Sequence, residues 1–372
     1  MRYKTAGVTG LLIALILASA ACTSAQPVSE ASAAPVVIVK AAQGGAVVAS
    51  LSSTTPGATI YYTVDGTTPT AASPRFESPF LVASPLTVKA IAINAGDRVS
   101  VVTTKTFATH IHSGTLVWQD EFSNSTGTNQ QPDPAVWGYD TGARGFGNHE
   151  LEDYCAWGSA EAPCDPAQPN AFVGTDGYLH IIARKTVAGT YTSARMKTQG
   201  LFGVRYGRVE ARIRVPEGQG IWPAFWSLGN NIATAGWPAC GEMDIMERVN
   251  SALSPDWNEG SVHGPGFTGD VGLGKKYFFP AGQTAAGWHT YGVIWTKDSA
   301  AFFVDDPAKP YVTYNNPSSL SGLSGAVWPF DGGESQFLIL NVAVGGDWPG
   351  APDGTTVFPK EMLVDYVRVY TN

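Results

Sequence analysis

The sequence predicts an all-β protein made of two β-sandwich domains. Its 372 residues include 42 Gly and 25 Pro, more turn-forming residues than a mainly helical chain would carry. Residues 209–215 alternate apolar and charged side chains, as a strand with one face in water does. No segment has the apolar periodicity of an amphipathic helix of three turns. The many strands and long connecting loops favour a two-sheet sandwich over a closed barrel.

The composition excludes some classes of partner. Charged residues are 15% of the chain, and 23 Lys+Arg against 31 Asp+Glu give a net charge of -8. Because no basic run is present, we do not expect nucleic acid or an anionic membrane surface as a partner. Aromatic residues reach 11% and include 11 Trp, which suits a protein that handles an uncharged, ring-shaped ligand. These features are a first indication that the ligand is a carbohydrate. We expect the protein to be a monomer.

Residues 1–22 have the pattern of an export signal. Arg2 and Lys4 precede an apolar stretch at 11–17 and the small residues 18–21. The stretch is too short to span a bilayer. Cys22 stands where a bacterial lipoprotein carries its lipid-accepting cysteine, although Ser19 occupies a position where such signals usually have Leu. We therefore expect an extracytoplasmic protein, either lipid-anchored at the bacterial cell surface through Cys22 or simply secreted.

Export would place the remaining cysteines in an oxidising compartment, where disulfides can form. Cys155 and Cys164 lie close together in a segment rich in Pro, Ala and Asp, and export permits them to form a disulfide. Cys240 is then left over. We expect it to be a small, buried apolar residue rather than a reactive thiol.

Residues 36–108 predict a small accessory domain, which a flexible Ala- and Ser-rich linker at 23–35 joins to the export signal. In 59–64 successive side chains alternate between two faces, so one of Tyr61 and Tyr62 must face a core. Segment 55–70 resembles the small β-sandwich module found at the C-terminus of chitobiase-type enzymes. It contains no catalytic cluster, and we expect it to act as a spacer.

A short linker at 109–115 leads into one large β domain at 116–372. Residues 337–344 are nearly all apolar and are long enough to form a buried central strand. Residues 363–370 predict another strand at the C-terminus.

Three carboxylates stand inside an apolar, strand-like run at 242–247. Glu242 and Asp244 are two residues apart and share one face of a strand, so Met243 and Ile245 point into the core. Glu247 has the opposite parity and would be forced into that core, where an unpaired charge is very unfavourable. A β-bulge near Met246 would return Glu247 to the side of the other two acids. We therefore predict that bulge.

The bulged strand would have the chemistry of a glycosidase. Glu242 and Glu247 would stand roughly 13 Å apart along the backbone. Side chains that lean together could bring their carboxyl groups to the ~5–5.5 Å typical of a retaining enzyme. Asp244 lies between them, raises their proton affinity, and would titrate with them as a coupled set. A surface strand with scattered acids would explain neither the apolar residues between them nor the nearby Trp residues.

The segment 242–247 resembles the signature of glycoside hydrolase family 16 in the bulged form of its laminarinase-like members. Further similar segments cover essentially all of 116–372; they are 118–122, 147–151, 192–195, 207–212, 222–226, 263–266, 340–346 and 364–370. The resemblance implies a concanavalin A-like β-jelly roll with an open cleft across one sheet. Residues 151–155 depart from the commoner pattern, which has Gln and a second Tyr. The resemblance therefore does not predict the details of the loop at that end of the cleft.

The resemblance also implies roles for the three acids. Glu242 would be the nucleophile, and Glu247 would be the acid that protonates the leaving oxygen and then the base that activates water. Asp244 would orient Glu242 and tune its charge. No cofactor would be needed for catalysis.

Sugar-binding candidates surround this strand. Trp222, Trp226 and Trp237 flank it and could stack on sugar rings, although core packing is the alternative for each. Four further residues resemble family positions that contact sugar hydroxyls or the catalytic carboxylates: Asn148, Arg195, His263 and Asn341. Family members often hold a structural calcium ion, for which Asp365 matches the side-chain ligand and Glu121 lies in a neighbouring motif.

We therefore expect a retaining endo-β-1,3-glucanase that acts on laminarin-type β-glucans, with mixed-linkage β-glucan as a further candidate substrate. Segment 263–266 resembles the laminarinase branch more than the agarase or carrageenase branches, and the acidic net charge disfavours a sulfated galactan, which would need a basic cleft. Two alternatives stay open on the same fold. One is a non-catalytic β-glucan-binding protein, which the three acids disfavour, and the other is a glucan transglycosylase.

Overall fold

The computed structural model describes residues 31–250 and 256–372. The predicted export signal at 1–22, including Cys22, and most of the 23–35 linker lie outside the described residues. Among the helices that are described, none is long and apolar enough to cross a membrane.

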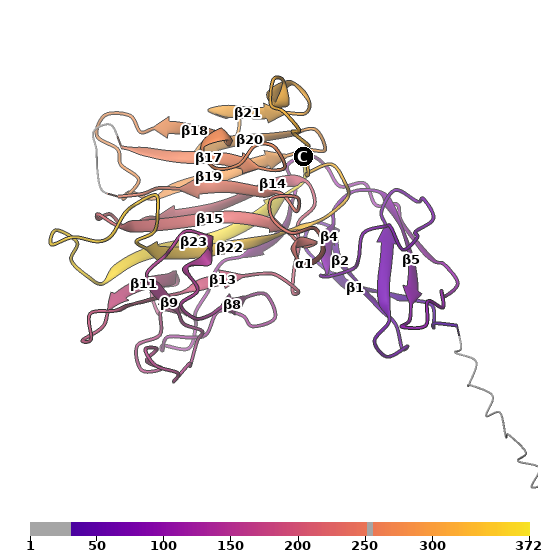
Figure 1. Cartoon of the computed structure of the whole chain (residues 1–372), viewed down its shortest axis with the longest axis horizontal. Helices are drawn as coiled ribbons and strands as arrows, with labels where there is room; N and C mark the ends of the chain where they lie inside the picture. The colour runs from indigo at the N-terminus through magenta and orange to yellow at the C-terminus, as the bar shows by residue number, and fades with distance from the viewer. Residues whose placement is uncertain (1–30, 251–255) are drawn as a thin grey trace, which may run out of the picture.

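The N-terminal module consists of two three-stranded sheets with the orders β1-β2-β4 and β3-β5-β6. Its strands are β1 Val36–Ala41, β2 Val47–Ser52, β3 Thr59–Thr63, β4 Phe80–Val82, β5 Leu86–Ile93 and β6 Thr103–Phe107. Of the two adjacent tyrosines, Tyr62 is the one that faces the core, where its ring stacks on Phe80 with centroids 5.5 Å apart. Figure 1 shows this module, in indigo, at one side of the larger domain.

The larger domain is a sandwich of a ten-stranded and a seven-stranded sheet. The ten-stranded sheet has the order β21-β20-β19-β14-β23-β11-β12-β9, with β10 paired to β11 and β7 paired to β23. Its strands are β7 Leu116–Asp120, β9 Glu152–Tyr154, β10 Ala171–Val173, β11 Leu179–Lys185, β12 Tyr191–Ser193, β14 Gly207–Arg214, β19 His289–Trp295, β20 Ser299–Val304, β21 Val312–Asn315 and β23 Lys360–Tyr370.

The seven-stranded sheet has the order β18-β17-β16-β15-β22-β13-β8. Its strands are β8 Gly138–Asp140, β13 Arg195–Lys197, β15 Ile221–Gly229, β16 Glu242–Glu247, β17 Trp257–His263, β18 Leu273–Phe278 and β22 Gln336–Val344. Short helical turns are α1 Ile232–Ala235, η1 Gly145–Gly147, η2 Gly269–Val271 and η3 Ser318–Leu320. The predicted all-β sandwich is confirmed.

The main core lies between these two sheets. The seven-stranded sheet contributes Phe225, Met243 and Leu340, and the ten-stranded sheet contributes Val209 and Val367. All nine residues of β22 are buried, and the strand lies between β15 and β13, as the apolar run at 337–344 predicts. In β14 the alternation places apolar side chains in the core and charged ones on the other face.

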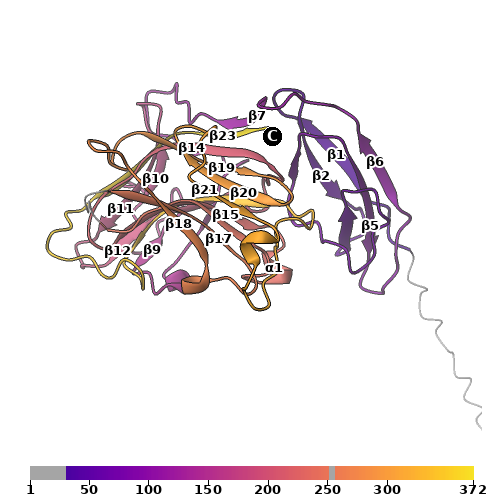
Figure 2. The same ribbon diagram turned by 90° about the horizontal axis from the view of Figure 1, so that it is seen from above.

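The N-terminal module packs against the large domain. The Leu81 amide donates to the Gly203 carbonyl at 2.9 Å, and the Gln43 amide donates to the Val117 carbonyl at 3.1 Å. Leu81 and Ala46 belong to the core cluster of the large domain. Figure 2, seen from above, shows β1, β2, β5 and β6 beside the larger sandwich.

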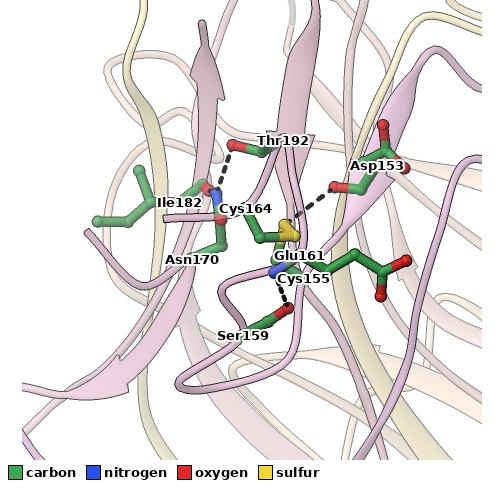
Figure 3. The surroundings of a disulfide bond; sticks show 8 residues. All are labelled: Asp153, Cys155, Ser159, Glu161, Cys164, Asn170, Ile182 and Thr192. Carbon is green, nitrogen blue, oxygen red and sulfur yellow. Dashed lines mark hydrogen bonds between the residues drawn. A yellow bond between two sulfur atoms is a disulfide. The ribbon is translucent and has the colours of Figure 1, made fainter. Parts of the chain in front are cut away.

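The predicted disulfide between Cys155 and Cys164 is present and closes a loop directly after β9. Figure 3 shows its surroundings, where the Asn170 amide donates to the Ile182 carbonyl at 2.7 Å and to the Thr192 hydroxyl at 3.1 Å. These bonds attach the chain after the loop to β11 and β12. Cys240 is buried, as predicted, and burial raises the pKa of its thiol to about 11.

Candidate active site

The segment with the three acids forms β16 and contains the predicted β-bulge. Against β15, Asp244 lies opposite Trp226 and Met246 lies opposite Phe225, so Ile245 has no partner of its own. Ile245 and Met246 are both buried, at 1% and 0% exposure. Two successive core-facing residues reverse the parity of the strand, and Glu247 therefore lies on the same side as Glu242 and Asp244.

These acids lie on the face of the seven-stranded sheet that points away from the core, which we call the carboxylate face. Its side chains come from five neighbouring strands, and each has at least one sequence neighbour in the core. They are Arg195 of β13, Asn341 of β22, Trp222 and Trp226 of β15, Glu242, Asp244 and Glu247 of β16, and Ser261 and His263 of β17. The topology thus gathers residues that lie between Arg195 and Asn341 in the sequence.

Two of the three tryptophans predicted to stack on sugar also donate hydrogen bonds to the glutamates. The indole N–H of Trp222 donates to Glu247 Oε1, and that of Trp237 donates to Glu242 Oε2, each at 3.0 Å. Trp237 is 52% exposed, so its ring remains open to a ligand. Sequence reasoning missed these hydrogen bonds, and the stacking role stays a prediction.

Asp244 is held from the neighbouring strand β17. The Ser261 hydroxyl donates to Asp244 Oδ2 at 2.8 Å, and Nε2 of His263 lies 3.1 Å from the same oxygen. His263 Nε2 also lies 3.9 Å from Glu242 Oε1. The ring of His263 therefore connects the first two acids of the cluster.

The two glutamates experience opposing influences. Burial and the charge of Asp244 raise the pKa of Glu242 to about 8, although His263, the Trp237 indole and Arg195 limit the rise. Burial, followed by the charges of Asp244 and Glu242, raises the pKa of Glu247 well above its ordinary value, and the Trp222 indole opposes this rise. More groups therefore favour the ionised form of Glu242, and the proton is directed to Glu247.

His263 supplies positive charge to the cluster. Burial would lower the pKa of its imidazole, but the hydrogen bond and charge of Asp244, together with the charges of Glu242 and Glu259, raise that pKa to about 9. The ring is thus an imidazolium at neutral pH.

The other predicted binding residues form a second group beside Trp226. The Arg195 guanidinium lies over the Trp226 ring at 4.6 Å and bonds Asp140 at 3.0 Å. The Trp226 indole donates to Asn341 Oδ1 at 2.7 Å. Asn148 follows the turn η1 and donates to Glu150 at 3.3 Å. The structure therefore links Arg195 and Asn341 directly to Trp226, and links Asn148 to Asn341 through Glu150 and Tyr154.

The residues expected to bind calcium do not fit that ion as placed. Both oxygens of Glu121 accept from Arg368, at 2.7 and 2.8 Å, and Asp365 forms an ion pair with Arg212. Sequence reasoning did not foresee these arginine partners, which stand on β14 and β23. Neither acid belongs to a group of three candidate metal ligands in the part of the chain that the structure describes.

Two features of this face were missed in the sequence. Ser261 could have been found by parity, because it lies two residues before His263 and therefore on the same side of β17. Trp348 meets the Trp222 ring edge-on, with centroids 5.4 Å apart, and is 42% exposed. Its position follows from a loop after β22 and has no local sequence signal.

Comparisons with known proteins identify the family of the large domain. A family model described as glycosyl hydrolases family 16 matches residues 162–360, and a second, described as Fn3 associated, matches 50–107, inside the N-terminal module. A β-glucanase of Rhodothermus marinus is 38% identical over 260 residues, which cover 68% of this chain and 84% of that protein. Glucan endo-1,3-β-glucosidase A1 of Niallia circulans is 33% identical over 279 residues, covering 68% of this chain but 37% of that protein.

Among solved structures, the catalytic domain of an endo-1,3-β-glucanase (laminarinase) from Thermotoga petrophila RKU-1 matches with a TM-score of 0.60 and 40% identity. The match covers 70% of this chain and 99% of that one. The family model spans more than half of the chain and includes the bulged strand with its three acids. The chain is a member of glycosyl hydrolase family 16.

Proposed function

We propose that the protein is a retaining endo-glycosidase that hydrolyses internal β-1,3-glucosidic bonds of laminarin-type β-glucans, with mixed-linkage β-glucan as a further substrate. The observation that carries this proposal is the bulge in β16, which puts Glu242 and Glu247 on one face with Asp244 between them. The names of the relatives, a β-glucanase, a glucan endo-1,3-β-glucosidase and a laminarinase, support the substrate.

In the first step, the Glu242 carboxylate attacks the anomeric carbon while Glu247 donates its proton to the departing glycosidic oxygen. The bond to the leaving sugar breaks, and a covalent glycosyl-enzyme forms on Glu242. The Trp237 indole and His263 favour the ionised form of Glu242 that this attack requires. Burial and the neighbouring acids keep the proton on Glu247 until it is transferred.

In the second step, Glu247 is a carboxylate and accepts a proton from water, whose oxygen attacks the anomeric carbon and releases Glu242. Two inversions at one carbon retain the configuration. The Trp222 indole donates to Glu247 Oε1 and stabilises the carboxylate that exists between the two steps. Both steps use side chains of this chain alone.

Asp244 acts as a positioning residue. Ser261 and His263 hold one of its oxygens, and its charge raises the proton affinity of both glutamates. Glu247 loses its proton in the first step and takes one from water in the second. The negative charge of Asp244 favours this second protonation.

A substrate panel tests the proposal. The purified protein should release reducing ends from laminarin, more slowly or comparably from mixed-linkage β-glucan, and not from agarose or carrageenan. Sizing of early products should give intermediate oligosaccharides, as internal cleavage does. Binding to laminarin without turnover would instead identify a glucan-binding protein, and longer chains formed at high oligosaccharide concentration would identify a transglycosylase.

We also propose that the protein is exported and acts as a monomer outside the cytoplasm. The pattern of residues 1–22 supports export. Radiolabelled palmitate supplied to a bacterial host should label the wild type but not Cys22→Ala if a lipid anchor forms. Unlabelled protein in the medium would indicate simple secretion, and retention of the unprocessed chain in the cytoplasm would contradict both.

A further inference from the structure

A second pair of acids stands outside the catalytic cluster, at the start of β9. Glu150 and Glu152 flank Leu151, and the three residues alternate in exposure: Glu150 is 9% exposed, Leu151 is 47% exposed and Glu152 is fully buried. The two carboxyl groups therefore share the buried side of the chain. The mechanism proposed above uses neither of them.

Donors to the pair are unequally distributed. Both oxygens of Glu150 accept hydrogen bonds, Oε2 from the Tyr154 hydroxyl at 2.8 Å and Oε1 from the Asn148 amide at 3.3 Å. Oε2 of Glu152 accepts from the Val344 amide at 2.6 Å. Oε1 of Glu152 is buried and meets no donor within the described ranges, while the side chain lies in hydrogen-bond contact with Glu150.

A hydrogen bond between two carboxyl groups requires a proton on one of them. Glu150 already accepts at both oxygens, so the oxygen left to carry a proton is Oε1 of Glu152. Glu152 then accepts from Val344, donates to Glu150 and leaves no buried oxygen unpaired. Burial and the charge of Glu150 raise the pKa of Glu152 well above its ordinary value, which agrees with this count.

Further charged and titratable groups surround the pair. Tyr154 lies on the same strand as Glu152, and the charge of Arg195, which stands on β13 of the other sheet and bonds Asp140, acts on it. Tyr191 of β12 stands opposite Glu152 in the strand register. Two neighbouring residues, His149 and Asp153, complete the set on the same segment, and the ring of His149 is exposed and pairs with Asp347.

The pair is connected to the carboxylate face. The Tyr154 hydroxyl, which donates to Glu150, accepts from the Asn341 amide at 3.2 Å. The carbonyl oxygen of that amide accepts from the Trp226 indole at 2.7 Å. Glu150 therefore determines which way the Tyr154 hydroxyl points, and Tyr154 determines which way the Asn341 amide is turned.

We propose that Glu152 is a permanently protonated positioning residue, whose O–H group fixes Glu150 as the acceptor that orients Asn148, Tyr154 and, through Asn341, the Trp226 ring. Ionisation of Glu152 would place two buried carboxylates in contact and break this chain of hydrogen bonds. Only the kinetic test of this proposal rests on the proposed function, because it measures cleavage of laminarin.

Glu152→Gln is the sharpest test, because a Gln side chain can accept from Val344 through its carbonyl and donate to Glu150 through its amide. We expect this variant to keep kcat/KM for laminarin within about twofold of wild type. Glu150→Gln is the matched control, since its amide nitrogen cannot accept from Tyr154 or Asn148. It should raise KM roughly tenfold with a smaller change in kcat.

Two readouts do not depend on catalysis. The infrared difference spectrum of wild type minus Glu152→Gln at neutral pH should contain the carbonyl stretch of a carboxylic acid. The melting temperature of wild type relative to Glu152→Gln should fall as pH rises above 4.5, the ordinary value of a Glu carboxyl, because only the folded wild type must hold a proton. If the protein did not cleave any β-glucan, the proposed function would fail while these two measurements still decided the state of Glu152.

An infrared difference spectrum without the acid band, or parallel melting curves across that pH range, would overturn the proposal. So would a loss of activity in Glu152→Gln as large as that in Glu150→Gln. Far-ultraviolet circular dichroism of both variants distinguishes these outcomes from a failure to fold, and Glu152→Asp provides a second acid of different reach if Glu152→Gln does not fold.

Discussion

Two pairs of acids in this molecule have the same spacing and opposite surroundings. Glu242 and Asp244 on β16, and Glu150 and Glu152 at β9, are each two residues apart on one side of the chain. In the β16 cluster, donors reach the acids from an indole, a hydroxyl and an imidazole, and the Glu242 side chain is 17% exposed. At β9, Glu152 is fully enclosed and receives a donor from the main chain of β22.

The difference shows that acid spacing does not determine function; the supply of donors and access to solvent do. Acids with several donors and a solvent-facing edge can exchange protons, as a double displacement requires. An enclosed acid with few donors keeps a proton and behaves as a neutral hydrogen-bonding group. The following experiments compare the two sites, beginning with the largest expected effect.

The same Glu-to-Gln exchange should separate the two sites by orders of magnitude. Glu242→Gln and Glu242→Ala remove the nucleophile and should lower turnover of laminarin by on the order of 10^4–10^6, as loss of a nucleophile does in other hydrolases. Glu152→Gln should leave it nearly unchanged. Initial rates of reducing-end release measure both, and laminarin affinity should survive in the Glu242 variants. Near-full activity in Glu242→Ala would show that the nucleophile is a different residue.

The sequence was sufficient to predict one of these sites but not the other. The parity of Glu247 within an apolar run predicted the bulge, because a strand alternates and an unpaired acid does not fit a core. The partners of Glu152 come from β22, almost two hundred residues away, and follow from tertiary packing. The signal available was the departure of 151–155 from the family pattern, which indicated an altered end of the site but not its chemistry.

Long-range partners also explain what sequence reasoning missed elsewhere. The indole N–H groups of Trp222 and Trp237 reach Glu247 and Glu242 because β15 and the loop before β16 meet the bulged strand. The sequence predicts these aromatic residues as stacking surfaces. Whether an indole N–H reaches a carboxylate depends on the orientation of the ring, which composition does not encode. The arginines that pair with Glu121 and Asp365 come from other strands in the same way.

Removal of the acid/base residue should have the next largest effect and should be reversible by an added nucleophile. Glu247→Ala should lower kcat by about 10²–10⁴, the usual contribution of general acid–base catalysis. Azide needs no general base, so with a substrate whose leaving group departs without a proton it should intercept the glycosyl-enzyme and raise turnover, with a β-glycosyl azide as product. Nuclear magnetic resonance of the product gives its anomeric configuration. An α-azide would contradict the assigned roles, and Glu150→Ala, the matched acid at the enclosed site, should not respond to azide.

Loss of a single indole donor should have a smaller effect and should move opposite limbs of the pH profile. Trp237→Phe removes a hydrogen bond that lowers the pKa of Glu242, so the acidic limb of kcat/KM should move to higher pH. Trp222→Phe removes the corresponding bond to Glu247, so the alkaline limb should move to higher pH. Each should reduce kcat roughly tenfold or less, as loss of one hydrogen bond to a charged group does. If both variants moved the same limb, the division of roles between the glutamates would be wrong.

The smallest effect is on stability. The free energy of unfolding should depend on His263 and on Glu152 over different pH ranges. His263 has its pKa raised from 6.5 to about 9, so its ion pair stabilises the fold fully below pH 6.5 and loses this contribution as pH rises to 9. The free energy of unfolding of wild type minus His263→Gln should therefore fall across that interval, by up to about 3 kcal/mol at 1.36 kcal/mol per pH unit.

Urea unfolding at a series of pH values measures this difference, and His149→Gln is the control because the ring of His149 is exposed and a surface pair contributes little. The corresponding difference for Glu152→Gln should already begin to fall above 4.5, since there the folded state holds a proton that the unfolded chain releases. Coincident windows for the two variants would mean that both sites respond to one titration, and the β16 cluster would then not be balanced by the imidazolium of His263. Separate windows would show that one acid cluster is neutralised by a cation and the other by a proton.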